Sequence, residues 1–278
     1  MRKRNGKDEA SKPIGVFDSG VGGLTVVRQI QTILPQESTV YFGDTARVPY
    51  GPKSDRLVRR FALQNSRFLI GHGVKAIVIA CNTASSVALD HVQRHVGVPV
   101  LGVIEPGVKA AVRVTQRGKI GVIGTVGTVE SEAYQRAIRS WGNNFEVFGQ
   151  ACPLFVPLAE EGWLNRRPTY LIAEEYLTPL KQSGIDTLIL GCTHYPLLKP
   201  VISEVMGSDI ELIDSAEATA RELRSLLDER NMLSGRSEEP SRAFFVSDVP
   251  HRFLEVAERF LGETLGRVER VDIETIEE

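Results

Sequence analysis

The sequence predicts an α/β protein with two pseudo-symmetric three-layer domains, each built around a mostly parallel sheet. Apolar runs of about four to six residues alternate with longer stretches of helical periodicity, which is typical of βαβ units. At 278 residues, the chain exceeds the size at which one hydrophobic core usually stops growing. Several short segments also recur later in the chain, which indicates that one α/β unit is present twice.

The internal repeat is visible in three pairs of segments. In each pair the second member follows the first by nearly the same number of residues. The pairs are 14–22 with 120–128, Cys81 with Cys192, and 100–105 with 210–214. Because residues after 215 lie beyond both copies, we expect them to return to the first domain. The predicted domains are therefore 13–105 with 216–278, and 106–215.

The elements are assigned in chain order from the spacing of apolar residues. Ser54 and Asp55 give the second helix a capped start, and 234–241 has the composition of an exposed loop. Strands are expected to begin near Ile14, Thr39, Ala76, Val98, Ile120, Phe145, Thr187, Ile210, Phe244 and Val268. Helices are expected near 23–34, 54–72, 83–95, 127–140, 168–182, 215–230 and 250–260.

Composition excludes several classes of function. The net charge is −2 with both signs spread along the chain, so no basic surface for nucleic acid is indicated. Neither a signal core nor a membrane-spanning apolar stretch is present, and three cysteines do not make a disulfide framework. We expect a cytoplasmic protein that binds neither membrane nor nucleic acid, with residues 1–12 as a basic, flexible tail.

Two thiols are the most informative candidate site residues. Cys81 and Cys192 each end an apolar run and precede small polar residues, so each sulfur is expected at the start of a helix, where a thiolate is favoured. The carboxyl ends of parallel strands carry the ligand site in such folds. Two thiols facing one cleft between the domains would form an acid/base pair. The same strand ends carry Asp18, Ser19, Asn82, Thr83, Thr125, Thr128, Thr193 and His194.

Other motifs leave alternatives open. The glycines 20, 22 and 23 do not complete a dinucleotide motif, because position 25 is Thr25, and they are better suited to binding a carboxylate. Two alternatives are a zinc site formed by Cys81, Cys192 and His194 and a redox pair of the two cysteines, although no C-x-x-C or H-x-x-x-H spacing supports them. Cys152 is expected to be a buried structural residue. Segment 43–51, with Tyr50 and Gly51, reads as a binding loop, and 160–163 as a solvated turn with a possible role.

From Pro13 onward the chain resembles the glutamate racemases of the aspartate/glutamate racemase superfamily. The motifs that carry the resemblance are 15–25, 41–51, 80–86 and 190–196. The resemblance implies an isomerase that interconverts L- and D-glutamate without a cofactor or metal and supplies D-glutamate for peptidoglycan, and hence for the cell wall and cell shape. It implies Cys81 and Cys192 as the two bases, with Asp18 and His194 assisting, and a possible homodimer.

The resemblance also implies the substrate contacts. They are Asp18, Ser19, Tyr50, Gly51, Asn82, Thr83, Thr193 and His194, with Thr125 and Thr128 as further candidates. Arg47 is the one nearby arginine, and we expect hydroxyls and backbone N–H groups, not a guanidinium, to hold the carboxylates. Two alternatives remain: a racemase of the same superfamily acting on aspartate or a hydantoin, and a non-catalytic module that binds a carboxylate or amino acid.

Overall fold

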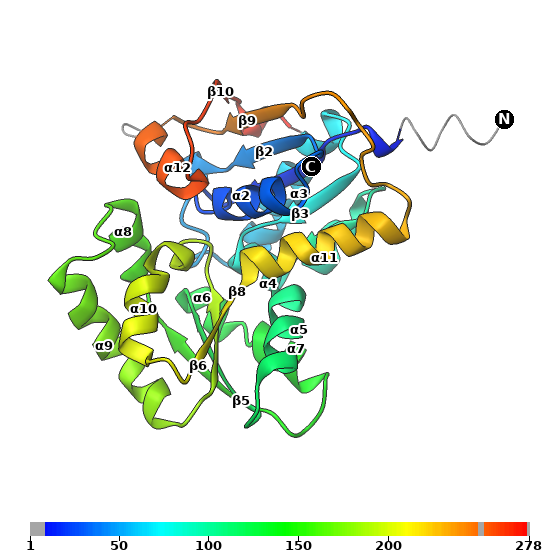
Figure 1. The fold of residues 1–278 in the computed structure, drawn as a ribbon. Helices are drawn as coiled ribbons and strands as arrows, with labels where there is room; N and C mark the ends of the chain where they lie inside the picture. The colour runs from blue at the N-terminus through cyan, green and yellow to red at the C-terminus, as the bar shows by residue number, and fades with distance from the viewer. Residues whose placement is uncertain (1–8, 250–252, 277–278) are drawn as a thin grey trace.

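The computed structural model describes residues 9–249 and 253–276, which form two parallel sheets stacked end to end (Figure 1). The six-stranded sheet has the order β10-β9-β2-β1-β3-β4, and the four-stranded sheet the order β6-β5-β7-β8. The first contains β1 (Ile14–Asp18), β2 (Thr39–Gly43), β3 (Ala76–Ile79), β4 (Val100–Gly102), β9 (Arg242–Val246) and β10 (Val268–Arg270). The second contains β5 (Lys119–Gly124), β6 (Glu146–Ala151), β7 (Thr187–Gly191) and β8 (Glu211–Asp214).

The two sheets share one strand order. The order β2-β1-β3-β4 in the first corresponds to β6-β5-β7-β8 in the second, and every described pairing is parallel. Cys81 follows β3 and Cys192 follows β7, so the thiols occupy equivalent places. This topology is what a duplicated unit produces. The strands after residue 215, β9 and β10, extend the first sheet beside β2.

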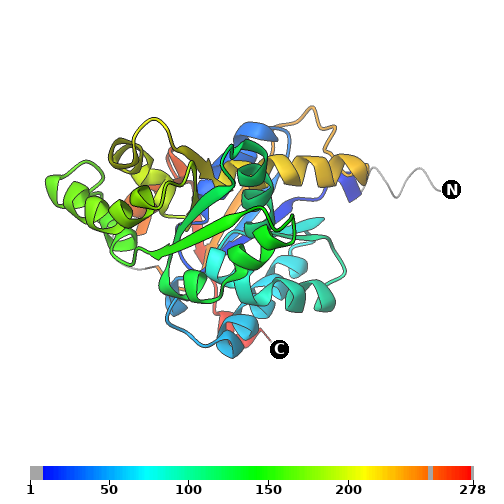
Figure 2. The ribbon, with the colours of Figure 1, turned by 90° about the horizontal axis from the view of Figure 1, so that it is seen from below.

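Helices cover both faces of each sheet, as parallel strands buried on two sides require. On the first sheet, α2 contacts α11 and α12, while α3 packs with α4; on the second, α5 packs with α7 and α9 with α10. Figure 2 shows the second sheet between its two helical layers. The helices are α2 (Leu24–Ile33), α3 (Asp55–Gly71), α4 (Asn82–His95), α5 (Ile104–Val114), α6 (Val126–Glu130), α7 (Ala133–Arg139), α8 (Phe155–Glu160), α9 (Arg167–Gln182), α10 (Lys199–Met206), α11 (Ser215–Glu229) and α12 (Phe253–Leu261).

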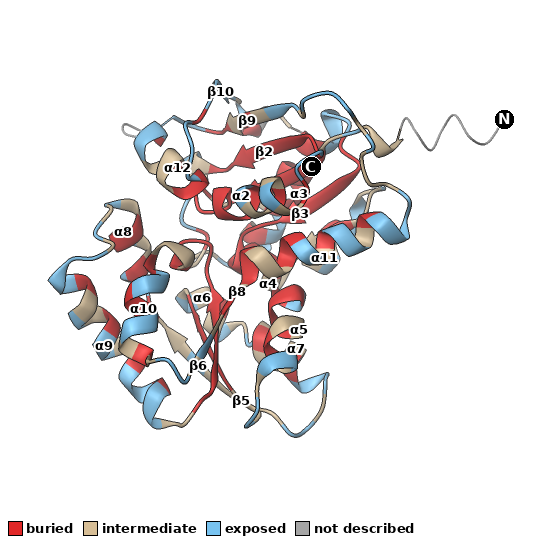
Figure 3. Cartoon of the chain, in the orientation of Figure 1, coloured by how far each residue is buried: buried red, intermediate tan, exposed pale blue. Residues whose placement is uncertain are grey.

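The central strands are the most buried part of the molecule. Every residue of β1, β2, β3 and β7 is buried, whereas β6 lies at an edge and is partly exposed (Figure 3). Three short 3-10 helices, Thr45–Arg47, Tyr195–Leu198 and Ile273–Thr275, complete the described elements. None of the described helices is long and apolar enough to cross a bilayer.

The predicted strands are confirmed, and the predicted helices only in part. Each strand begins within two residues of its expected position. Helices α5, α8 and α10 were not predicted, because Pro106, Pro157 and Pro200 fall in or near their first turns and interrupt the apolar pattern. The helix expected over 127–140 is two helices, since Glu132 adopts a left-handed conformation with φ of 49°.

Several expectations concern the chain ends and the caps. Residues 1–8 of the basic tail lie outside the described residues, as do 250–252 of the last predicted helix. Within the described part, Ala10 accepts a hydrogen bond from the buried Lys75 at 2.7 Å. Ser54 stands at the N-cap of α3, but its side chain makes no capping hydrogen bond. Helix α5 begins at Ile104, just before the predicted start of the second domain.

Candidate active site

The ends of β3 and β7 bring the two predicted thiols into one buried region. Cys81 and Cys192 are free cysteines, each only 6% exposed. Charge on Cys192 contributes to raising the pKa of Cys81, so each sulfur lies in the electrostatic field of the other. The third cysteine, Cys152, is fully buried, as predicted for a structural residue.

Cys81 is held in its protonated form. It is the N-cap of α4, where its Sγ accepts a hydrogen bond from Ala84 N at 3.4 Å, and it donates to Ser19 Oγ at 3.5 Å. Burial, and then the charge of Asp18, raise its pKa to about 12. The expectation that the helix terminus would favour a thiolate here is therefore wrong, because burial outweighs the helix N-terminus.

Cys192 has a cationic neighbour instead. No α-helix follows it directly, contrary to expectation, because the turn at Thr193–His194 leads into a 3-10 helix that contains Pro196. His194 Nδ1 lies 3.8 Å from Cys192 Sγ. Burial by itself lowers the pKa of His194, but its hydrogen bonds to Cys192 and Glu160 outweigh burial and raise that pKa to about 10. The imidazolium thus places a positive charge beside the Cys192 sulfur.

Glu160 completes this arrangement; the sequence singled out its segment, 160–163, but assigned no role to Glu160 itself. Its Oε1 lies 2.9 Å from His194 Nε2, so it fixes the ring and its charge from the side opposite the thiol. Glu160 is the last residue of α8 and the first of segment 160–163, which was interpreted from the sequence as a solvated turn with a possible role. A contact between residues 34 positions apart leaves no local pattern. The available signals were the polar segment 160–163 and the Pro-interrupted apolar run 153–159 before it.

Two glycines let loops of the two sheets approach closely. A Cβ at Gly22 would lie 2.2 Å from Thr193 Oγ1 and 2.6 Å from His194 Nδ1. A Cβ at Gly127 would lie 2.5 Å from Gly51 O. These positions need glycine because no side chain fits between the loops. The glycine loop after β1 therefore faces the Cys192 turn.

Hydroxyl groups from both sheets form a cluster beside Cys81. Thr83 Oγ1 lies 3.1 Å from Thr125 Oγ1 and 3.3 Å from Thr128 Oγ1. Thr25 on α2 donates to Thr193 O at 3.1 Å across the same junction. The strand ends thus collect polar groups from both halves of the chain, as the repeat predicted.

Two buried polar atoms next to Cys81 have no hydrogen-bond partner. They are Asp18 Oδ1, an acceptor, and Asn82 Nδ2, a donor. The other oxygen of Asp18 accepts from Gly20 N at 2.9 Å, and the other amide atom of Asn82 accepts from Tyr134 at 2.7 Å. Burial raises the pKa of Asp18 despite the opposing effect of His194. Unsatisfied buried groups are rare, and these two are suited to binding a polar ligand.

The loop that carries Tyr50 and Gly51 is fixed by a buried carboxylate. Asp44 accepts from Arg47 Nε at 2.8 Å, from Ser247 Oγ at 3.0 Å and from the Tyr50 hydroxyl. The remaining guanidinium nitrogens of Arg47 donate to Gln64 and Asn65. Arg47 is thus engaged in holding the loop and is not directed at a ligand.

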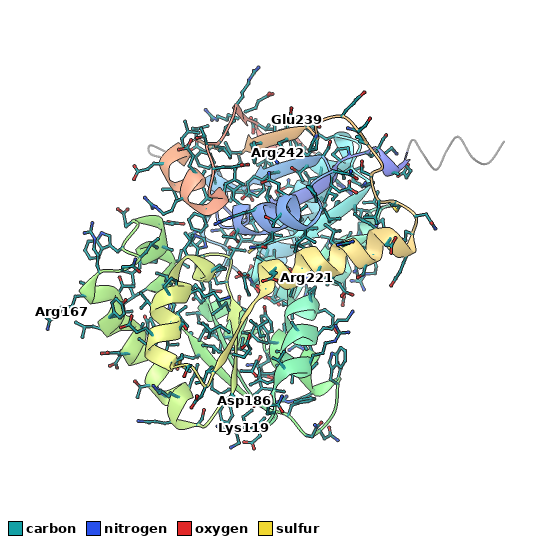
Figure 4. All side chains as sticks on the ribbon, in the orientation of Figure 1. Lys119, Arg167, Asp186, Arg221, Glu239 and Arg242 are labelled. Atoms are coloured by element: carbon teal, nitrogen blue, oxygen red, sulfur yellow. The ribbon has the colours of Figure 1, made fainter. Side chains whose placement is uncertain are left out.

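We expect Arg47→Ala to lower the free energy of unfolding by about 3 kcal/mol, because a buried charged partner, Asp44, is left uncompensated. Arg221→Ala is the matched control, since Arg221 pairs with Glu217 on the exposed face of α11 (Figure 4). It should cost no more than about 0.5 kcal/mol. Urea unfolding of the two variants measures the difference. Equal, small losses would show that the Asp44 network does not hold this loop.

A cavity of about 950 Å³ lies between the two halves on the side of α4 and α6. Gly51 is the one predicted site residue that lines it. The two thiols are not among the residues that line this cavity, and both are nearly inaccessible.

Sequence comparison identifies a family and full-length relatives. Residues 14–223 match the family model described as Asp/Glu/Hydantoin racemase. The glutamate racemase of Geobacter metallireducens is 52% identical over 267 residues, which cover 96% of this chain and 99% of that protein.

Solved structures match this chain in both fold and length. Glutamate racemase RacE1 of Bacillus anthracis superposes with a TM-score of 0.90 at 43% identity, covering 94% of this chain and 97% of that one. The glutamate racemase of Francisella tularensis, solved with D-glutamate, has a TM-score of 0.90 at 42% identity and covers 96% of this chain and 99% of that one. The predicted α/β class with parallel sheets is confirmed.

Proposed function

This chain belongs to the aspartate/glutamate/hydantoin racemase family, and we propose that it interconverts L- and D-glutamate with Cys81 and Cys192 as its two bases. A racemase must remove the α-proton from one face and deliver a proton to the other. Thiols at equivalent strand ends of two facing sheets meet this requirement. The observation that carries the proposal is their contrasting surroundings: a carboxylate beside Cys81 and an imidazolium beside Cys192.

At the start of a turnover of L-glutamate, Cys192 is the base and Cys81 is the acid. The Cys192 thiolate, stabilised by His194, removes the α-proton of L-glutamate and becomes a thiol. The Cys81 thiol gives its proton to the opposite face and becomes a thiolate, which yields D-glutamate. In the reverse direction the roles exchange. The pKa values seen in a rate profile therefore belong to coupled groups.

The hydroxyl cluster and the unpartnered atoms are the candidate substrate contacts. Asn82 Nδ2 and the hydroxyls of Thr83 and Thr193 can donate to carboxylate oxygens. Asp18 Oδ1 can accept from the substrate ammonium group. Ser19, Tyr50, Gly51, Thr125 and Thr128 are the remaining proposed contacts. With these groups paired and water excluded, the negative charge that develops at the α-carbon is stabilised by hydrogen bonds.

The proposal extends to the setting of the enzyme. The product D-glutamate would supply peptidoglycan synthesis in the cytoplasm, and the enzyme would act as a homodimer. The domains would be 13–105 with 216–278, and 106–215, which agrees with the division of the strands between the two sheets.

Circular dichroism of L-glutamate incubated with the pure protein tests the function. The signal should decay to zero with parent protein and persist with Cys81→Ala. L-aspartate and a chiral hydantoin, run in parallel, test the other substrates of the family. A signal that persists with glutamate but decays with one of these would reassign the substrate. Persistence with all three would favour a binding module without turnover.

We expect activity to survive exhaustive chelation and carbonyl reagents such as hydroxylamine, because the two thiols perform both proton transfers without a metal or pyridoxal group. The measurement is the initial rate before and after treatment, with apo-protein checked for metal content. A rate lost on treatment and restored by zinc or pyridoxal phosphate would contradict the two-thiol mechanism.

A further inference from the structure

Helix α12 connects the first sheet to the histidine of the site. It packs on α2, and its Arg259 reaches the carboxyl end of α8 on the second half of the chain. Arg259 Nη1 donates to Glu160 O at 2.6 Å and to Ala159 O at 3.4 Å. Figure 1 shows α12 above and to the right of α8. The guanidinium therefore satisfies carbonyl groups that the end of a helix leaves without partners.

Contacts with Gly162, just after α8, and with its own helix fix the position of the Arg259 side chain. Gly162 follows α8 with a φ of 69°, and a Cβ there would lie 2.9 Å from Arg259 Cζ. The guanidinium thus lies flat against this glycine, where no other residue would leave room for it. On its own helix, Arg259 Nη2 lies 3.2 Å from Glu255 Oε1. The side chain is 22% exposed, so these contacts are only partly screened by water.

The next residue of α12 contacts the imidazole ring itself. Phe260 is fully buried, and its ring meets that of His194 edge to face, with centroids 4.9 Å apart. One helix therefore holds both the backbone of Glu160 and the ring that Glu160 orients. A change at α12 therefore acts first on the Cys192 side of the site.

On the function proposed above, we propose that Arg259 is a positioning residue for proton transfer at Cys192: it holds the end of α8 so that Glu160 keeps His194 against the thiol. The charged and titratable groups around His194 are Cys192 beside it, Glu160 on α8 and Asp18 after β1. Arg259 on α12 acts on His194 indirectly, through the backbone of Glu160, and Glu255 acts through its ion pair with Arg259.

Arg259→Met removes the donor and retains the length of the side chain. We expect kcat to fall about 10-fold, as is typical when a residue that orients an active group is lost. KM should stay within about twofold, because no substrate contact is removed. The alkaline limb of the rate profile should move to lower pH, since His194 loses its proton more readily when Glu160 is no longer held against it. Arg259→Lys, which can still donate to one carbonyl, should restore part of kcat.

The matched control is Arg28→Met. Arg28 on α2 covers Gly262 in the same way, since a Cβ there would lie 2.8 Å from Arg28 Cζ. Arg28 thus packs from α2 against the residue that follows α12, whereas Arg259 donates to carbonyl groups of α8. We expect parent kcat and an unchanged rate profile, with a melting temperature close to that of Arg259→Met. If both variants lost kcat equally, Arg259 would serve only to anchor α12.

A deuterium isotope effect gives the decisive readout. With α-deuterated substrates, Arg259→Met should raise the effect for the enantiomer whose proton Cys192 removes and lower it for the other. A general loss of structure would not separate the two enantiomers. Parent kcat, or isotope effects that change equally for both, would overturn the proposal. If the parent protein did not racemise glutamate, the proposed function would be wrong. That result is distinct from failure of the Arg259 proposal, in which the parent racemises glutamate and the Arg259 variants do not behave as expected.

Discussion

In Cys81→Ala incubated in heavy water, racemisation should stop while L-glutamate slowly acquires deuterium without inversion. Cys192 can still remove the α-proton of L-glutamate and return a deuteron to the same face. The opposite face has lost its acid, so D-glutamate should not form and added D-glutamate should stay unlabelled. Loss of a general acid or base costs about 10² to 10⁴ in rate. Cys192→Ala should show the mirror pattern.

Mass spectrometry and chiral chromatography of each pure enantiomer measure this result. Cys152→Ala is the matched control, because it removes a buried thiol that takes no part in the mechanism, and it should racemise. Labelling of the opposite enantiomer would exchange the roles of Cys81 and Cys192. Racemisation near the parent rate in either variant would rule out the two-base assignment.

For His194→Asn we expect kcat/KM to fall about 100-fold or more, because the cation that stabilises the Cys192 thiolate is removed. In the parent, hydrogen bonds to Cys192 and Glu160 raise the pKa of His194 to about 10 against the effect of burial. The imidazolium is therefore present at neutral pH and lost as pH rises through that value. The parent rate should decline in this range, and the variant should lack that decline.

Rate profiles from pH 6 to 11 for parent and variant give the comparison. The amino group of the substrate titrates in the same way in both assays. The difference between the two rate profiles therefore reports the titration of His194. His95→Asn is the control, since His95 is exposed on α4, where its ring bonds to the backbone carbonyl of His91 at 2.7 Å. A parent profile that only rises, or a variant with the parent profile, would show that His194 does not supply this charge.

The strands and the thiols could be predicted from sequence because each leaves a local pattern. Uninterrupted β-branched runs mark buried parallel strands. The repeated unit predicted that Cys81 and Cys192 follow equivalent strands, as they do. The same repeat indicated that polar residues from both halves would meet. Thr83 and Thr125 lie on different sheets and are in contact.

What sequence reasoning missed depends on contacts between distant residues. The partnership of His194 with Glu160, and that of Glu160 with Arg259, joins three segments that share no local pattern. The protonated state of Cys81 was also missed. Its helix position favours a thiolate, and only the three-dimensional burial beside Asp18 reverses that preference.

The nearly complete burial of both thiols also affects what happens between turnovers. On the mechanism proposed above, conversion of L-glutamate leaves the proton on Cys192 and the negative charge on Cys81, which is the form suited to D-glutamate. The free enzyme would therefore differ in protonation state according to the enantiomer it last released. Before it could accept L-glutamate again, the proton would have to move from Cys192 to Cys81, each of which is only 6% exposed. At high substrate concentration, this isomerisation of the free enzyme would be rate-limiting in place of proton transfer at the α-carbon.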